Sequence, residues 1–153
     1  MWDIEQLKEI KLFKDLSIAE LESVSSIARL QTFKAGEIII KENEIGKHLY
    51  AVIEGSVRIS KLIAAGEKVT FTTLKKGSFF GELSLLTQKA HSATAEAMED
   101  TRVMVISKID FDRFIEATPQ AGFKIFKVII GEISELLKQM NNRFIDMMGY
   151  MWH

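Results

Sequence analysis

The segment 75-KKGSFFGELSLLTQKAHSATAEA-97 contains the most informative pattern in this sequence. Two glycines lead from a turn into a very short predicted helix, whose first N–H groups have no partner within the helix. Glu82 stands at the first helical position, as a carboxylate favoured by the helix dipole or as an acceptor for a sugar hydroxyl. Ser92 and Thr94 follow, where they suit either donation to phosphate oxygens or a strand that binds nothing. The segment is thus a candidate ligand site.

Short stretches rich in β-forming residues lie on both sides of this segment. From Leu30 onward hydrophobic residues alternate with smaller or polar ones, and glycines separate the stretches at intervals of about ten residues. This spacing predicts an antiparallel sandwich or a small barrel, and leaves the choice between them open. The clearest stretches are EIIIKE (37–42), LYAVIEGSVRISKL (49–62), KVTFTTL (68–74) and TRVMVISK (101–108).

The two ends of the chain have helical spacing. Ser17 is expected to begin a helix as its N-cap, with Glu20 completing a capping box. Near the other end Asp110 is expected to cap a short helix, and Pro119 suits the first turn of a long one. We expect one domain over residues 1–153, with N-terminal helices at 1–29, β strands at 30–108 and C-terminal helices at 109–151.

The long helix has hydrophobic residues at alternating intervals of three and four, which is a heptad pattern. A helix of roughly 40 Å outlasts the surface that its own domain offers. We expect this seam to pair with a second copy in a parallel two-fold dimer, while Ile125, Ile129 and Leu136 cover the domain's own core. The alternative is a seam that lies on its own core. The seam comprises Phe123, Phe126, Ile130, Ile133, Leu137, Met140, Phe144, Met147 and Met151.

The composition argues against several classes of function. Twenty basic and twenty-one acidic residues give a net charge of −1, so no global positive field attracts nucleic acid or an anionic membrane. Hydrophobic runs are too short to cross a membrane, and the lack of cysteine excludes disulfides and thiolate sites. His48, His91 and His153 lack the spacing of a metal site, and no activated-serine motif is present. We expect a soluble cytoplasmic protein that is not an enzyme and requires neither metal nor cofactor.

The order of these elements resembles the cyclic nucleotide-binding domains of the catabolite activator protein family, ion channels and cyclic nucleotide-dependent kinases. The resemblance covers nearly the whole chain and rests on FKAGEI (33–38), GKHLYAVIEG (46–55) and GSFFGELSLL (77–86). It implies a mainly β protein with flanking helices. In that fold a double-stranded β-helix, or jelly-roll-like β-roll, has N-terminal helices on one side and a long C-terminal dimerisation helix.

The resemblance also implies a phosphate-binding cassette at residues 77–94. Glu82 is similar to the family's glutamate that accepts the ribose hydroxyl, with the backbone N–H groups around it near the sugar and the cyclic phosphate. The family's arginine, which pairs with that phosphate, is replaced here by His91, so the main countercharge is mostly absent at pH 7. The implied ligand residues are Gly81, Glu82, Leu83, His91, Ser92 and Thr94.

Two further features depart from the family. The polar pair that contacts adenine in the catabolite activator protein corresponds to Leu136 and Leu137, which leaves base selectivity open. No helix-turn-helix follows before His153, so we expect no direct DNA binding by this chain. We expect a ligand-sensing regulatory module that binds a cyclic nucleotide or a related phosphorylated small molecule and signals through the helix dimer. The alternative is a degenerate fold that serves as a dimerisation or protein-interaction scaffold without nucleotide.

Overall fold

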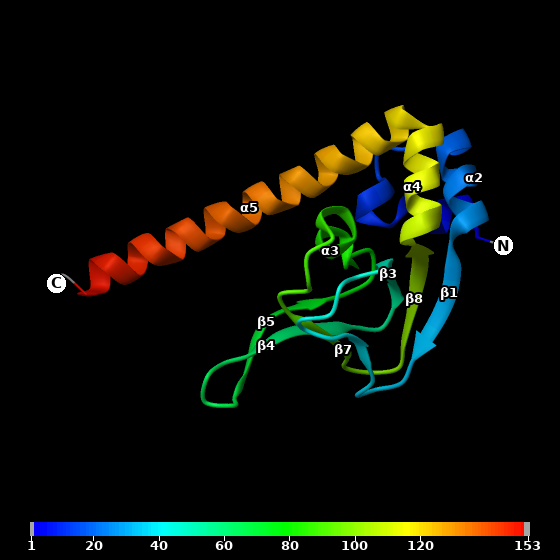
Figure 1. Cartoon of the computed structure of the whole chain (residues 1–153). Helices are drawn as coiled ribbons and strands as arrows, with labels where there is room; N and C mark the ends of the chain where they lie inside the picture. Colours follow the sequence, from blue (N-terminus) through cyan, green and yellow to red (C-terminus); the bar gives the residue numbers. More distant parts are fainter. Residues whose placement is uncertain (1, 152–153) are drawn as a thin grey trace.

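A computed structural model describes residues 2–151, in which two four-stranded antiparallel sheets are flanked by helices (Figure 1). One sheet has the order β1-β8-β3-β6 and the other β2-β7-β4-β5. The strands are β1 (Arg29–Phe33), β2 (Ile38–Ile40), β3 (His48–Glu54), β4 (Val57–Leu62), β5 (Lys68–Leu74), β6 (Phe79–Phe80), β7 (Thr94–Ala97) and β8 (Thr101–Ser107). The helices are α1 (Ile4–Lys8), the 3-10 turn η1 (Lys11–Phe13), α2 (Ile18–Ile27), α3 (Glu82–Thr87), α4 (Lys108–Ala117) and α5 (Pro119–Met151). The expected mainly β class with flanking helices is confirmed.

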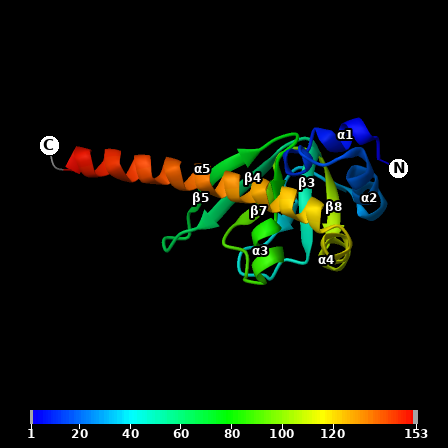
Figure 2. The ribbon, with the colours of Figure 1, turned by 90° about the horizontal axis from the view of Figure 1, so that it is seen from above.

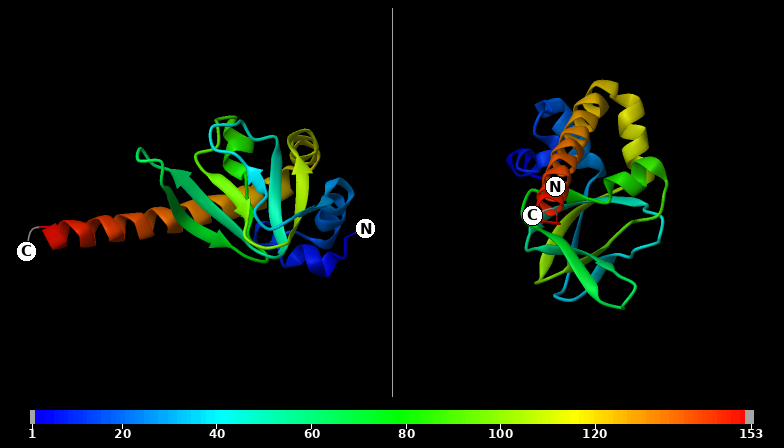
Figure 3. Two further views of the ribbon diagram at one scale, coloured as in Figure 1. Left: turned by 90° about the horizontal axis from the view of Figure 1, so that it is seen from below. Right: turned by 90° about the vertical axis from the view of Figure 1, so that its left-hand side faces the viewer.

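The central strands β3 and β8 are apolar on both faces because both faces are covered. Leu49 and Met104 belong to the large cluster formed with the helices, whereas Val52 and Val103 belong to clusters between the two sheets. Figure 3 shows the sheets facing each other, with the helices outside one of them. A strand buried on both sides reads as a continuous apolar run, which explains the stretch LYAVI.

The predicted cap of the N-terminal helical region is confirmed, because Ser17 and Glu20 form the capping box at the start of α2. Helix α1 is short: it ends at Lys8, and a 3-10 turn follows. Ile10 and Leu12, beside and within this turn, are fully buried.

The cap of α4 differs from the expectation. Strand β8 continues to Ser107 and the helix starts at the next residue, so Ser107 occupies the N-cap position. Its hydroxyl oxygen accepts the N–H of Asp110 at 3.2 Å. Asp110, predicted as the cap, lies inside the first turn, where its carboxylate is favoured by the helix dipole.

Helix α5 consists of two parts that differ in their surroundings. Residues 119–133, here called the packed half, bury Ala121, Ile125 and Ile129 against the domain. Residues 134–151, the projecting half, are exposed throughout and extend past the β-roll (Figures 1 and 2). Leu136, expected on the core with Ile125 and Ile129, is exposed because the helix has left the domain at that point.

The heptad seam is divided between two environments. Phe126 and Ile133 are half-buried against the chain's own core, whereas Phe123 and Ile130, on the adjoining line of the same seam, are exposed. Phe126 and Ile133 therefore contact the chain's own core, and the expectation that they also face a second copy stays a prediction. The other exposed seam residues all lie in the projecting half: Leu137, Met140, Phe144, Met147 and Met151.

Candidate functional site

The turn before α3 requires a glycine. Gly81 has a φ of 86°, in the left-handed region that L side chains rarely adopt. A Cβ atom at this position would lie 3.0 Å from the carbonyl oxygen of His48 and 3.3 Å from side-chain atoms of Ile40 and Tyr50. The backbone at Gly81 thus lies closely against β2 and β3, and Glu82 follows it as the first residue of α3.

Glu82 is the first residue of α3, and its side chain is half-buried. Burial raises its pKa to about 7, since desolvation disfavours the charged carboxylate, and the nearby negative charge of Glu132 on α5 acts in the same direction. Helix α5, which carries Glu132, passes above α3 in Figure 1. Near neutral pH the Glu82 carboxyl group is divided between its two protonation states, so it can accept or donate a hydrogen bond to a hydroxyl. The next residue, Leu83, is exposed.

His91 is held by the loop between β2 and β3. Its backbone N–H donates to the carbonyl of Glu44 at 2.8 Å, and its carbonyl accepts the N–H of Asn43 at 2.9 Å. The imidazole ring packs so closely on Gly46 that a Cβ there would be 2.8 Å from Nε2. Burial lowers the pKa of His91, although the charge of Glu44 opposes this, so the ring is mainly neutral at pH 7.

Ser84 is a structural residue of the cassette that sequence reasoning did not identify. Its hydroxyl accepts the N–H of Gly46 at 2.7 Å and donates to the carbonyl of Lys89 at 2.6 Å. The side chain is buried, and it ties α3 both to the loop at Gly46 and to the segment that leads to His91. A lone serine within the apolar run GELSLL was the available signal, because a buried hydroxyl needs partners.

The last two predicted ligand residues lie where the cassette enters β7. Ser92 is exposed in the loop before the strand. Thr94 is the first residue of β7, and its hydroxyl oxygen accepts the N–H of Glu42 at 3.1 Å. That bond leaves the Thr94 proton free to donate elsewhere. The structure therefore places Gly81, Glu82 and Leu83 at the start of α3, and the other three residues along the returning segment.

The interior of the roll below Gly81 is aromatic and aliphatic. Tyr50 stacks on Phe80 with ring centroids 5.1 Å apart and planes 11° apart. Burial raises the pKa of the Tyr50 hydroxyl, as expected for a ring turned into this interior. Ile40, Val52 and Val57 complete the surrounding cluster. Aromatic side chains of this kind can stack on the flat face of a planar ligand that reaches them.

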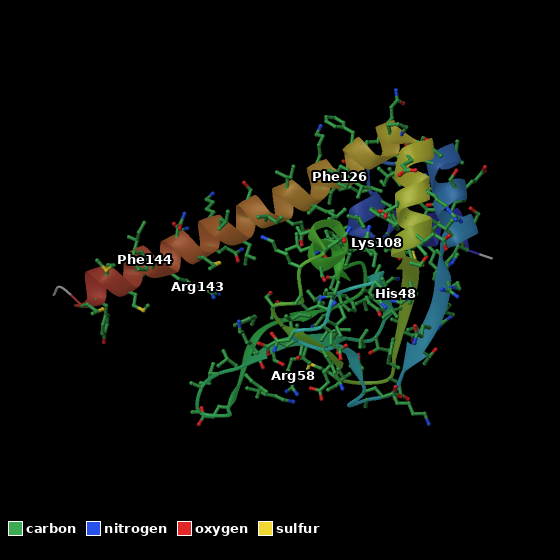
Figure 4. All side chains as sticks on the ribbon, in the orientation of Figure 1. His48, Arg58, Lys108, Phe126, Arg143 and Phe144 are labelled. Carbon is green, nitrogen blue, oxygen red and sulfur yellow. The ribbon has the colours of Figure 1, made fainter. Side chains whose placement is uncertain are left out.

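Within residues 2–151 no group of three or more His, Asp or Glu side chains comes together to hold a metal ion. His48 lies at the start of β3 (Figure 4) and belongs to no such group. His153 lies outside the described residues. In the same part of the chain no helix combines the length and apolarity required to cross a bilayer.

Comparison with known sequences gives a consistent result. The pattern of the family described as "Cyclic nucleotide-binding domain" matches residues 30–118. A cyclic AMP receptor protein from Thermus thermophilus is 28% identical over 129 residues, covering 84% of this chain and 60% of the relative. A cyclic nucleotide-gated channel from Caenorhabditis elegans is 31% identical over 143 residues, covering 90% of this chain and 19% of the relative. The chain thus spans between one-fifth and three-fifths of these proteins.

Comparison with solved structures agrees. The crystal structure of Thermus thermophilus catabolite activator protein superposes with a TM-score of 0.77 at 27% identity, covering 86% of this chain and 62% of that one. The regulatory domain of Toxoplasma gondii PKA, crystallised with cAMP, gives a TM-score of 0.74 at 22% identity, with 86% and 48% covered. At 22% identity, the likeness to the Toxoplasma gondii domain shows the fold alone.

Proposed function

The chain belongs to the family of cyclic nucleotide-binding domains, and from this membership we propose that it is a regulatory module that senses a small ligand in its β-roll. The ligand is a cyclic nucleotide or a closely related small molecule, bound without any catalytic step. The module acts in the cytoplasm, as expected from the sequence, and makes no direct contact with DNA, in keeping with its net charge of −1.

The observation that carries this proposal is the geometry of Gly81 and Glu82. The left-handed glycine fixes the start of α3 against β2 and β3. The half-buried carboxyl group of Glu82 is proposed to bind a ribose hydroxyl there. The backbone N–H groups of Gly81 and Leu83 are proposed to lie near the sugar and the phosphate. His91, Ser92 and Thr94 are proposed to line the edge where the phosphate would lie.

Helix α5 is proposed to carry the signal. Its packed half passes close to α3 (Figure 2), and Leu85 of α3 belongs to the same core cluster as Ile125 and Ile129, so a ligand that moves α3 would disturb the packing of α5. The ligand shifts the helix only as far as it binds one helix arrangement better than the other. The exposed seam of the projecting half is proposed to pair with the same helix of a second copy, because it would otherwise leave a long apolar stripe in water.

A second candidate is a scaffold that keeps the fold and the dimer but binds no nucleotide. His91 favours it, because a mainly neutral imidazole stands where the family has a guanidinium. The two candidates differ in one measurable property, the stabilisation of the folded state by a ligand.

Thermal unfolding in the presence of cyclic mononucleotides, cyclic dinucleotides, plain nucleotides and nucleosides tests the proposal. A ligand at a hundred times its Kd stabilises the fold by about 2.7 kcal/mol, which raises the midpoint by about 5–10 °C. The Glu82→Ala variant should lose this shift, and Glu116→Ala, which removes an exposed carboxylate on α4, should keep it. No shift with any compound at millimolar concentration would support the scaffold.

A further inference from the structure

The charges of the molecule bear on which ligand the roll accepts. All twenty lysines and arginines lie within residues 2–151, and seventeen of them are exposed. The other three, Arg58, Lys108 and Lys124, are half-buried, and each pairs with a carboxylate, respectively that of Glu96, Asp112 and Glu20. Arg58 and Lys108 are labelled in Figure 4. Within residues 2–151 every lysine and arginine is therefore either exposed to solvent or paired with a carboxylate.

The half-buried groups at the site itself offer no replacement charge. The imidazole of His91 packs against Gly46 and lies near the buried hydroxyl of Ser84, and its burial favours the neutral ring. Lys89, the basic side chain within the cassette, is exposed, while its carbonyl is bound by Ser84. A phosphate drawn into this site would lose water without gaining a buried cation, and the exposed ammonium of Lys89 would be screened by solvent, which is unfavourable for a buried ion.

The titratable group that does face the site is an acid. Glu82 is half-buried at the start of α3, and Glu132 of the packed half adds a second negative charge near it. The rise in the pKa of Glu82 shows that one negative charge is already disfavoured here. An additional anion in the same space would be disfavoured by repulsion as well as by desolvation.

The remaining surface suits an uncharged ligand with a flat ring. The interior below Gly81 is formed by Ile40, Tyr50 and the stacked ring of Phe80. A carboxyl group at the start of α3 and aromatic side chains near it fit a molecule that joins hydroxyl groups to a planar base.

We propose that, if the β-roll binds a ligand as the proposed function requires, it selects an uncharged hydroxyl-bearing ring compound of the nucleoside class over the corresponding phosphorylated nucleotide. The hydroxyl groups bind Glu82 at the start of α3, and the base stacks within the apolar interior.

Calorimetric titration at pH 7 tests this selection with three matched pairs: adenosine and cyclic AMP, guanosine and cyclic GMP, cytidine and cyclic CMP. At least one nucleoside should bind the unmodified chain about tenfold or more tightly than its cyclic monophosphate. His91→Arg should tighten binding of that cyclic monophosphate, relative to binding of its nucleoside by the same protein, by about ten- to a hundredfold. Gln31→Arg, on the exposed strand β1, adds the same charge away from the site and should change neither.

The outcomes separate this inference from the proposed function. Tighter binding of a cyclic nucleotide than of every nucleoside by the unmodified chain overturns the selection and supports the proposed function. Binding of cyclic nucleotide by His91→Arg, with no nucleoside bound by either protein, overturns the selection too. Absence of binding by both proteins overturns both proposals. If His91→Arg does not fold, the affinity ratio in the unmodified chain decides alone.

Discussion

The packed and projecting halves of α5 have the same heptad pattern in sequence but opposite surroundings in the structure. Phe126 and Ile133 on the seam of the packed half are half-buried against the domain, whereas Leu137 and Phe144 on the seam of the projecting half are 53% and 61% exposed. Figure 4 shows Phe126 on the part of α5 above α3, and Phe144 where the helix stands alone. The comparison teaches that apolar spacing identifies a helix face that has to be buried. The extent of the domain determines which part of that face packs against the same chain.

The largest effect is expected from disrupting the proposed dimer contact of the projecting half. Replacing Leu137 and Phe144 by Glu places four carboxylates in the proposed two-fold seam and should weaken dimerisation by at least about a thousandfold. Light scattering at tens of micromolar protein should then give a dimer for the unmodified chain and a monomer for the variant. The matched control replaces Gln139 and Asn142 by Glu, which adds the same charge off the seam. A monomeric unmodified chain contradicts the proposal.

Truncating one side chain in each half measures how much the packing of that half against its own domain stabilises the fold. In the monomeric Leu137→Glu, Phe144→Glu background, Ile125→Ala should lower the unfolding free energy by about 2–5 kcal/mol, because it removes a fully buried side chain. Met140→Ala, in the projecting half, should change the same quantity by less than about 0.5 kcal/mol. Urea unfolding checks both values. Equal losses would mean that the projecting half folds back onto the domain in solution.

The ion pair that ties the packed half to α2 should have a smaller, pH-dependent effect. Lys124 Nζ lies 2.7 Å from Glu20 Oε1, and this contact is the main reason that the pKa of Glu20 is below its ordinary value of 4.5. Its contribution is therefore present above pH 4.5 and is lost as the pH falls through the lowered pKa. Lys124→Met should cost about 1–3 kcal/mol at pH 7.

Unfolding of the unmodified chain and Lys124→Met between pH 3 and pH 7 tests this expectation. The difference in unfolding free energy between the two proteins should become smaller as Glu20 becomes protonated. A difference that stays constant down to pH 3 would assign the loss to packing of the lysine stem. Lys127→Met, one turn further along α5 and exposed, is the matched control.

The smallest effect concerns the cassette beneath the packed half. The pKa of Glu82 is raised to about 7, so its contribution to stability is full below pH 4.5 and is lost as the pH rises through about 7. Relative to Glu82→Gln, the unmodified chain should lose on the order of 1–2 kcal/mol between pH 5 and pH 8. Thermal midpoints of the two proteins across this range provide the measurement, and parallel curves would contradict a desolvated Glu82.

Sequence patterns predicted the class of the fold and most of its elements because these depend on local spacing and on the order of segments. The box at Ser17 and Glu20 and the start of α5 at Pro119 are local features, and both were predicted correctly. Strand β1 is mostly exposed and β6 has two residues, so neither has the alternation by which a strand is recognised.

The features that the sequence did not reveal all depend on long-range contacts. The bonds of Ser84 to Gly46 and Lys89, and the proximity of Glu132 to Glu82, arise only once distant segments are placed together. Asp110 was mistaken for a cap because the end of β8 at Ser107 could not be located. The roles of the cassette residues remain predictions for the titrations described above.

The straightness and length of α5 also give it a mechanical property. Its projecting half has eighteen residues, which at 1.5 Å per residue extend roughly 27 Å beyond the packed half. A tilt of about 10° of the packed half would displace the far end sideways by about 5 Å, about half the diameter of a helix. In the proposed route of signalling the helix is therefore a lever, in which a small rearrangement at the cassette becomes a sideways displacement of several ångströms at Met151.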